Sequence, residues 1–146
     1  MQSIDILLIE DNPGDVELTR ESLNGSKIKN SLNVIMDGEE ALDYLFQRGQ
    51  YDLAKLPDLI LLDLNLPKVS GREILKEIKS DAARSSIPII VLSSSEAASD
   101  IQRSYQLHAN CFVTKPVCLA DFLTVIQMIE FFWIDIVKLP MKDAIQ

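Results

Sequence analysis

The chain has 146 residues, a length that fits one domain built around a single hydrophobic core. Its hydrophobic content of 47% is enough for such a core, and its net charge of −8 argues against a nucleic-acid surface, which needs a basic patch. The sequence shows neither a signal peptide nor an apolar run long enough to span a bilayer. We therefore expect a cytoplasmic protein with no nucleic-acid and no membrane partner.

Short apolar runs alternate with longer amphipathic segments along the chain. Expected strands cover Ile4–Glu10, Asn33–Met36, Asp58–Asp63, Ile87–Leu92 and Asn110–Val113. Expected helices cover 13–24, 38–48, 71–79, 96–107 and about 119–137. This repeated βα alternation predicts an α/β fold, a doubly wound five-stranded parallel sheet with helices on both faces.

Helix start signals support three of these helices. Asn12 is placed to cap the first helix, which Pro13 opens. Two further helices begin with capping-box spacing, at Asp37 with Glu40 and at Ser70 with Glu73. The segment Gln47–Leu56 is expected to form a longer connection.

The two cysteines and the single histidine do not indicate a catalytic or zinc site. Cys111 and Cys118 lack the CxxC spacing of zinc ligands, so buried free thiols in a reducing cytoplasm are the favoured interpretation. His108 is expected at the end of a helix, where a cation suits the helix dipole.

Polar side chains stand at or just beyond the ends of four of the expected strands. Acidic residues lie at the ends of the first and third strands, a serine at the end of the fourth and a lysine beyond the fifth, at Glu10, Asp11, Asp63, Ser93 and Lys115. Because functional groups gather beyond the carboxyl ends of strands in doubly wound sheets, we expect these residues to lie together. Clustered carboxylates repel one another, and a divalent cation relieves that repulsion. All-oxygen ligands suit Mg²⁺.

This set of residues predicts phosphoryl transfer. Asp63 can act as a nucleophile that forms an aspartyl phosphate, while Mg²⁺ and Lys115 neutralise charge on the transferring group. The Ser93 hydroxyl can donate to a phosphoryl oxygen. Each residue alone has an ordinary structural interpretation, as a strand-end cap, a helix cap or a surface lysine. The combination favours a site.

These residues resemble the receiver domain of two-component response regulators. The resemblance covers nearly the whole chain and rests on Glu10-Asp11, Asp63, Pro67, Gly71, Ser93 and Lys115-Pro116. It implies a flavodoxin-like sheet of strand order 2-1-3-4-5 and phosphorylation of Asp63 by a histidine kinase. It also implies Mg²⁺ binding through Asp11, Asp63 and the backbone carbonyl of Asn65, with Glu10 as the other acidic position. The protein would be a signalling phosphoacceptor, not an enzyme, that promotes its own phosphorylation and dephosphorylation.

The resemblance further implies a switch. Ser93 replaces the commoner threonine and keeps its hydroxyl, whereas Phe112 occupies the aromatic switch position without a hydroxyl. A phosphoryl group on Asp63 would draw in Ser93 and Lys115, and Phe112 would turn into the vacated space. The family also implies a cis peptide bond between Lys115 and Pro116.

A closer resemblance is to the stand-alone regulators that serve cyanobacterial phytochromes. It rests on the segments 62–68, 104–112 and 129–133, and it implies a phytochrome-type histidine kinase as partner. Because 31 residues follow Lys115, the extended last helix and tail from about 119 leave no room for an output domain. We therefore expect one receiver domain over 1–146 that signals through protein contacts.

The expected last helix has more apolar surface than one buried face requires. Its polar residues form only a narrow stripe, at Asp121, Thr124, Gln127, Glu130 and Asp135. The excess, with Phe131, Phe132 and Trp133, indicates a partner surface. The related regulators form homodimers here, which implies a homodimer through the fourth helix, fifth strand and fifth helix.

Three alternatives remain open. The first is a phosphorylation-independent binding module on a receiver scaffold. The second is a phosphatase of the haloacid-dehalogenase type, which Asn65 disfavours because it cannot protonate a leaving group. The third is a flavodoxin-like FMN carrier, which the acids of the loop 11–15 disfavour because they repel phosphate.

Overall fold

The computed structural model describes residues 3–25, 29–93 and 111–114 of the chain. In chain order these form β1 (Ile4–Ile9), α1 (Pro13–Asn24), β2 (Asn30–Ile35), α2 (Gly38–Leu45), the 3₁₀ helix η1 (Gly49–Tyr51), β3 (Leu59–Asp63), α3 (Gly71–Lys79), β4 (Ile89–Ser93) and β5 (Cys111–Thr114). The helices expected at 96–107 and 119–137 lie outside the described residues.

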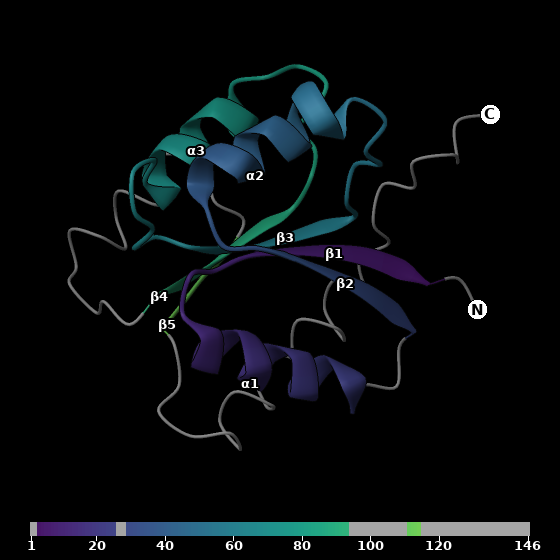
Figure 1. The fold of residues 1–146 in the computed structure, drawn as a ribbon, viewed down its shortest axis with the longest axis vertical. Helices are drawn as coiled ribbons and strands as arrows, with labels where there is room; N and C mark the ends of the chain where they lie inside the picture. Colours follow the sequence, from purple (N-terminus) through teal and green to yellow (C-terminus); the bar gives the residue numbers. More distant parts are fainter. Residues whose placement is uncertain (1–2, 26–28, 94–110, 115–146) are drawn as a thin grey trace.

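The strands form one parallel sheet in the order β2-β1-β3-β4-β5. Helix α1 covers one face of the sheet, and α2 and α3 cover the other (Figure 1). The expected α/β class and strand order are therefore confirmed, and the described part of the chain is a three-layer sandwich. The helix after β1 packs on one face of the sheet, and the helices after β2 and β3 pack on the opposite face (Figure 1). This is the doubly wound arrangement.

The alternation of side chains along the central strands builds a separate core on each face. One core lies under α2 and α3 and includes Leu7, Ile9, Ile60, Leu62, Ile74 and Ile78. The other lies under α1 and includes Ile6, Leu8, Leu59, Leu61, Val16 and Leu23. Strands β1 and β3 are buried on both faces of the sheet. Their side chains must therefore be apolar at almost every position, as they are in the sequence.

Strand β2 begins three residues earlier than predicted, at Asn30 and not at Asn33. Polar and apolar residues alternate from Ser31 to Val34, and among the described strands β2 pairs with β1 alone, from Ile4 opposite Asn30 to Ile9 opposite Ile35. An edge strand tolerates exposed polar side chains, so the polar start of the segment is compatible with pairing. The start of β2, Asn30-Ser31, is polar and so gave no apolar pattern from which to predict a strand.

Strand β4 begins two residues later than predicted, at Ile89. Pro88 precedes it and has no N–H to donate, although its carbonyl accepts a 3.0 Å hydrogen bond from the Ile60 N–H. The approach to β4 is held by Lys79, whose ammonium donates to the carbonyls of Ser85 and Ile87 at 2.9 and 2.7 Å. Burial lowers the pKa of Lys79 from its usual value.

Helix α2 ends at Leu45, three residues before the predicted end. Gln47 has a φ of +57°, in the left-handed region, which stops the helix. The guanidinium of Arg84 donates to the Leu45 carbonyl and, at 3.1 Å, to the Gln47 side chain. It also stacks on Phe46, 4.7 Å from the ring centroid. A distant arginine thus fixes this helix end, and no local sequence signal marks it.

The start of α2 differs from the predicted capping box. Asp37 caps the helix, but its carboxylate accepts from the N–H of Glu39 at 2.8 Å. The Glu40 carboxylate instead accepts from the hydroxyl of Tyr51, which raises the pKa of Tyr51. In contrast, Asn12 caps α1 through Asp15 N–H, and Ser70 caps α3 through Glu73 N–H, as predicted.

The described helices are all short. None of them has both the length and the apolar character needed to cross a membrane.

Candidate functional site at the carboxyl edge of the sheet

The strand register brings the predicted site positions to one edge of the sheet. The partners across the strands are Ile9 with Leu62, Asp63 with Leu92, and Ser93 with Thr114. Glu10 directly follows Ile9, so it lies level with Asp63. Strand β5 ends level with Ser93, at the residue before Lys115.

Glu10 and Asp63 extend two apolar rows that face α1. Ile6 and Leu8 precede Glu10 at alternate positions, and Leu59 and Leu61 precede Asp63 in the same way. Since alternate residues of a strand share a face, both carboxylates leave the sheet toward its α1 side. The fold therefore converges them, although 53 residues separate them in the chain.

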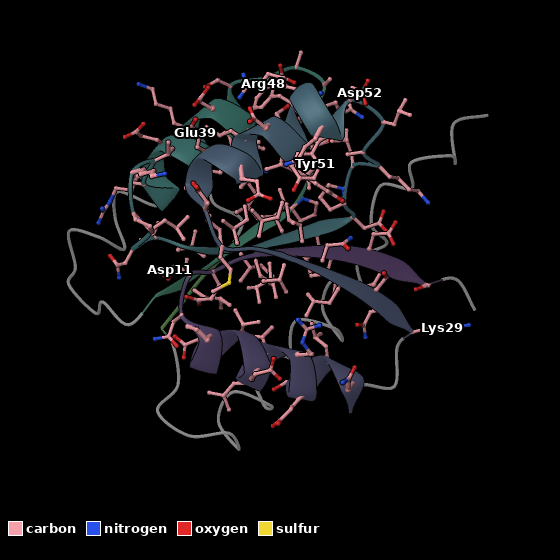
Figure 2. The ribbon with its side chains drawn as sticks, viewed as in Figure 1. Asp11, Lys29, Glu39, Arg48, Tyr51 and Asp52 are labelled. Atoms are coloured by element: carbon pink, nitrogen blue, oxygen red, sulfur yellow. The ribbon has the colours of Figure 1, made fainter. Side chains whose placement is uncertain are left out.

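The carboxylates of Glu10, Asp11 and Asp63 form a cluster. One oxygen from each lies within 4.8 Å of the others. Glu10 and Asp63 are 1% and 3% exposed, whereas Asp11 is open to solvent. Figure 2 shows Asp11 where β1 leads into α1, on the opposite side of the sheet from Arg48, Tyr51 and Asp52.

Backbone N–H groups hold the two buried carboxylates in place. The Asn12 N–H donates to Glu10 Oε2 at 3.2 Å, and the Asn65 N–H donates to Asp63 Oδ1 at 3.0 Å. Helix α1 begins two residues after Asp11, so its positive end lies beside the cluster. The two hydrogen bonds orient the buried carboxylates but do not separate them from each other.

Gly71 allows the chain to fold tightly beyond Asp63. A Cβ at this position would lie 2.4 Å from the Asp63 carbonyl oxygen and 2.6 Å from the Leu64 Cα, closer than atoms can approach. The Gly71 N–H also donates to the Leu64 carbonyl at 3.1 Å. Any larger residue would push α3 away from the end of β3 and so disturb the Asp63 backbone.

The cluster fits a divalent cation that prefers oxygen ligands. Metal–oxygen bonds of about 2.1 Å let one Mg²⁺ ion span oxygens about 4.2 Å apart. The carboxylate oxygens of the cluster all lie within 4.8 Å of one another, close to this span. Glu10, Asp11 and Asp63 therefore have both the donor chemistry and the spacing for Mg²⁺ or Mn²⁺.

Other predicted site groups fall outside the described part of the chain. These are Lys115, the Lys115–Pro116 peptide bond, and the side chains of Ser93 and Phe112. The backbones of Ser93 and Phe112 lie in β4 and β5.

An ion pair and a close backbone contact near the site were not predicted from the sequence. Lys68, in the loop between β3 and α3, pairs with Asp37 at the start of α2, with 3.8 Å between Nζ and Oδ2. Gly38 packs directly against Val69 of the same loop. A glycine straight after a helix cap was the available signal, because only a close contact explains it there.

Residues 6–127 match the response regulator receiver domain. The chain belongs to the response regulator receiver family. It is 45% identical over 135 residues to the response regulator Rcp1 of Synechocystis sp. (strain PCC 6803), covering 92% of each chain.

Solved receiver structures agree with the fold. The phosphorylated cyanobacterial phytochrome response regulator RcpA superposes with a TM-score of 0.91 at 46% identity, covering 96% of this chain and 100% of that one. The Mn²⁺-bound form of Rcp1 gives 0.88 at 44% identity, covering 94% of this receiver and 99% of the other chain. The resemblance to phytochrome response regulators is therefore confirmed.

Proposed function

We propose that this receiver is a stand-alone, cytoplasmic response regulator of a two-component phosphorelay that accepts a phosphoryl group on Asp63. The observation that carries the proposal is the position of Asp63. It is buried at the end of a central strand, oriented by the Asn65 N–H and grouped with Glu10 and Asp11. The phosphorylated relative RcpA supports phosphorylation as the activity.

The chemistry follows from this arrangement. An oxygen of the Asp63 carboxylate attacks the phosphorus of a phosphohistidine or a small acyl phosphate, a P–O bond forms and the bond to the donor breaks. The hydrogen bond from Asn65 orients the carboxylate for this attack. Water later attacks the phosphorus, which returns the carboxylate and releases phosphate. The receiver promotes both steps and so acts as a phosphoacceptor.

Asp11 and Asp63, with Glu10 and the Asn65 backbone carbonyl, are the proposed ligands of Mg²⁺. When bound, the cation neutralises charge on the transferring phosphoryl group. The relative Rcp1, whose structure was solved in a Mn²⁺-bound form, supports the binding of a divalent cation. The receiver supplies the oxygen ligands and keeps two of the three carboxylates buried.

Lys115, Ser93 and Phe112 are proposed to read the phosphorylated state. The lysine pairs with the phosphoryl group, the serine hydroxyl donates to it, and the phenylalanine ring follows the serine. The output is a changed face of the fourth helix, fifth strand and fifth helix, which we propose is also the homodimer surface. The phytochrome response regulators among the relatives support a phytochrome-type histidine kinase as donor.

The test is the intact mass of the protein after incubation with acetyl phosphate, with and without Mg²⁺. We expect a gain of one phosphoryl group that requires Mg²⁺ and is lost in the Asp63→Asn variant. The Asp52→Asn variant is the matched control, since Asp52 lies on the other side of the sheet (Figure 2) and should leave labelling unchanged. No gain under any condition would favour a phosphorylation-independent binding module.

A further inference from the structure

The loop from Leu64 to Ser70 leaves the phosphorylation site and carries Asn65. It is anchored at its far end by Gly71, whose N–H bonds to the Leu64 carbonyl at 3.1 Å. It is anchored near Asp63 by the hydrogen bond from the Asn65 N–H. Its middle section needs a further support, because neither of these bonds restrains residues 67–69.

The start of α2 provides that support. A Cβ on Gly38 would lie 2.4 Å from the Val69 carbonyl oxygen and 3.2 Å from the Val69 Cβ, so the loop backbone rests on the helix. Beside this contact, Lys68 pairs with Asp37, the residue that caps α2. Both helices lie on the same face of the sheet (Figure 1).

Lys68 has an unfavourable backbone conformation. Its φ is +63°, in the left-handed region, which a residue with a Cβ adopts only where the surroundings hold it. The described residues contain one other non-glycine position with positive φ, Gln47, and Arg84 holds that one. The Lys68 side chain, 69% exposed, forms an ion pair with Asp37 at 3.8 Å between Nζ and Oδ2, and this contact links the left-handed residue to the start of α2.

We propose that Asp37 and Lys68 are positioning residues for the cation site. They hold the loop so that the Asp63–Asn65 turn keeps the geometry that binds a divalent cation. The inference rests on the proposed function only in assigning a cation to the Glu10, Asp11 and Asp63 cluster. Neither residue belongs to the set that the sequence analysis placed at the site.

Positioning and simple charge effects predict opposite results for one of the two residues. If the residues acted only through their charges, loss of the Lys68 cation would strengthen cation binding and loss of the Asp37 anion would weaken it. If they position the loop, either loss weakens binding. Once the pair is broken, removing the second partner has little further effect.

The experiment is a double-mutant cycle on the affinity for Mn²⁺, measured by titration calorimetry without a phosphodonor. Asp37→Asn keeps a good helix cap, and Lys68→Asn keeps a residue that tolerates the left-handed region. We expect each single variant, and the double variant equally, to bind about three- to fivefold more weakly, the scale of an exposed ion pair. Lys76→Gln, on the exposed face of α3, is the control and should bind as the unchanged protein does.

Hydrogen exchange of the backbone amides 64–70 in the metal-free protein is the second readout. We expect faster exchange in both single variants and not in Lys76→Gln. The proposal would be overturned if the two single variants changed the Mn²⁺ affinity in opposite directions, if their effects on affinity were additive, or if amide exchange stayed the same. It would also be overturned if the protein without substitutions bound no Mn²⁺. A receiver that shows the expected cycle but takes no label from acetyl phosphate would overturn the proposed function alone.

Discussion

At the residue scale, the acidic cluster that is proposed to bind a cation destabilises the protein when no cation is bound. Three carboxylates with oxygens within 4.8 Å of one another repel in the metal-free protein, and two of them are buried. A cation removes that repulsion, so the cluster is a cost that binding relieves. The same groups therefore have opposite effects on stability in the two states.

We predict that Asp11→Asn stabilises the metal-free protein and weakens cation binding. Asp11 is open to solvent, so relief of repulsion should be about 0.5–1 kcal/mol, or about 2–5 °C in Tm. Loss of a ligand should lower Mg²⁺ affinity by about tenfold or more. Thermal unfolding with and without Mg²⁺ measures both effects.

The matched control is Asp52→Asn, which removes the same charge away from the cluster (Figure 2). It should keep the shift in Tm that Mg²⁺ causes. If Asp11→Asn instead lowered Tm without metal and kept the Mg²⁺ shift, Asp11 would be a structural residue and not a ligand.

The sequence predicted the residues of this cluster well. Glu10, Asp11 and Asp63 each follow an apolar run, and a parallel sheet brings such ends to one edge. It could not predict the pairing of Lys68 with Asp37. Both are ordinary surface residue types. Lysine also gives no sequence signal for a left-handed backbone conformation, which Lys68 adopts here.

At the element scale, the junction between β3 and α3 depends on a close backbone approach. Gly71 starts α3 where a Cβ would overlap the Asp63 carbonyl and the Leu64 Cα. The first turn of the helix is capped by Ser70. The strand end that carries the proposed nucleophile and the helix start are therefore one packed unit.

We predict that Gly71→Ala destabilises the protein by about 1–3 kcal/mol, because overlapping backbone atoms must move apart. It should also weaken Mg²⁺ binding by displacing Asp63. Urea unfolding gives the free energy, and calorimetry gives the affinity.

Gly25→Ala is the comparison for this prediction. A Cβ there would lie 3.8 Å from its nearest neighbours, with an ordinary φ of −83°, so its effect should stay within about 0.5 kcal/mol. Equal effects of the two changes would show that the close approach at Gly71 is not what fixes this junction.

Some helix and strand ends could be predicted from local sequence patterns, and others depend on contacts with distant residues. Helix α1 and helix α3 have the predicted bounds because caps and apolar spacing agree. Helix α2 ends early because Arg84 reaches its last carbonyl from a loop 39 residues away. Strand β2 was predicted too short because pairing with β1, and not its own hydrophobicity, makes it a strand.

At the scale of the whole molecule, the described sheet shows how the proposed phosphorylation site connects to β4 and β5. The strand register places the site at one edge, and β4 and β5 lead away from Ser93 and Thr114 at that edge. A phosphoryl group at Asp63 is thus one strand away from the segment that we propose to signal.

We predict a homodimer through this face. The expected helix 119–137 has only five polar residues in its stripe, more apolar surface than one sheet face covers. Light scattering after size-exclusion chromatography at micromolar concentration should give twice the 16.4 kDa chain mass. Phe132→Glu should give a monomer that still takes label from acetyl phosphate, whereas a monomeric unchanged protein would contradict the dimer.

Chemical trapping of the acyl phosphate shows whether Asp63 is the phosphorylated residue. Borohydride reduces an aspartyl phosphate to homoserine, which peptide mass spectrometry locates. After treatment with acetyl phosphate and Mg²⁺, we expect homoserine at position 63 and none when Mg²⁺ is omitted. Homoserine at another position, or none at all in a protein that binds Mg²⁺, would contradict phosphorylation of Asp63.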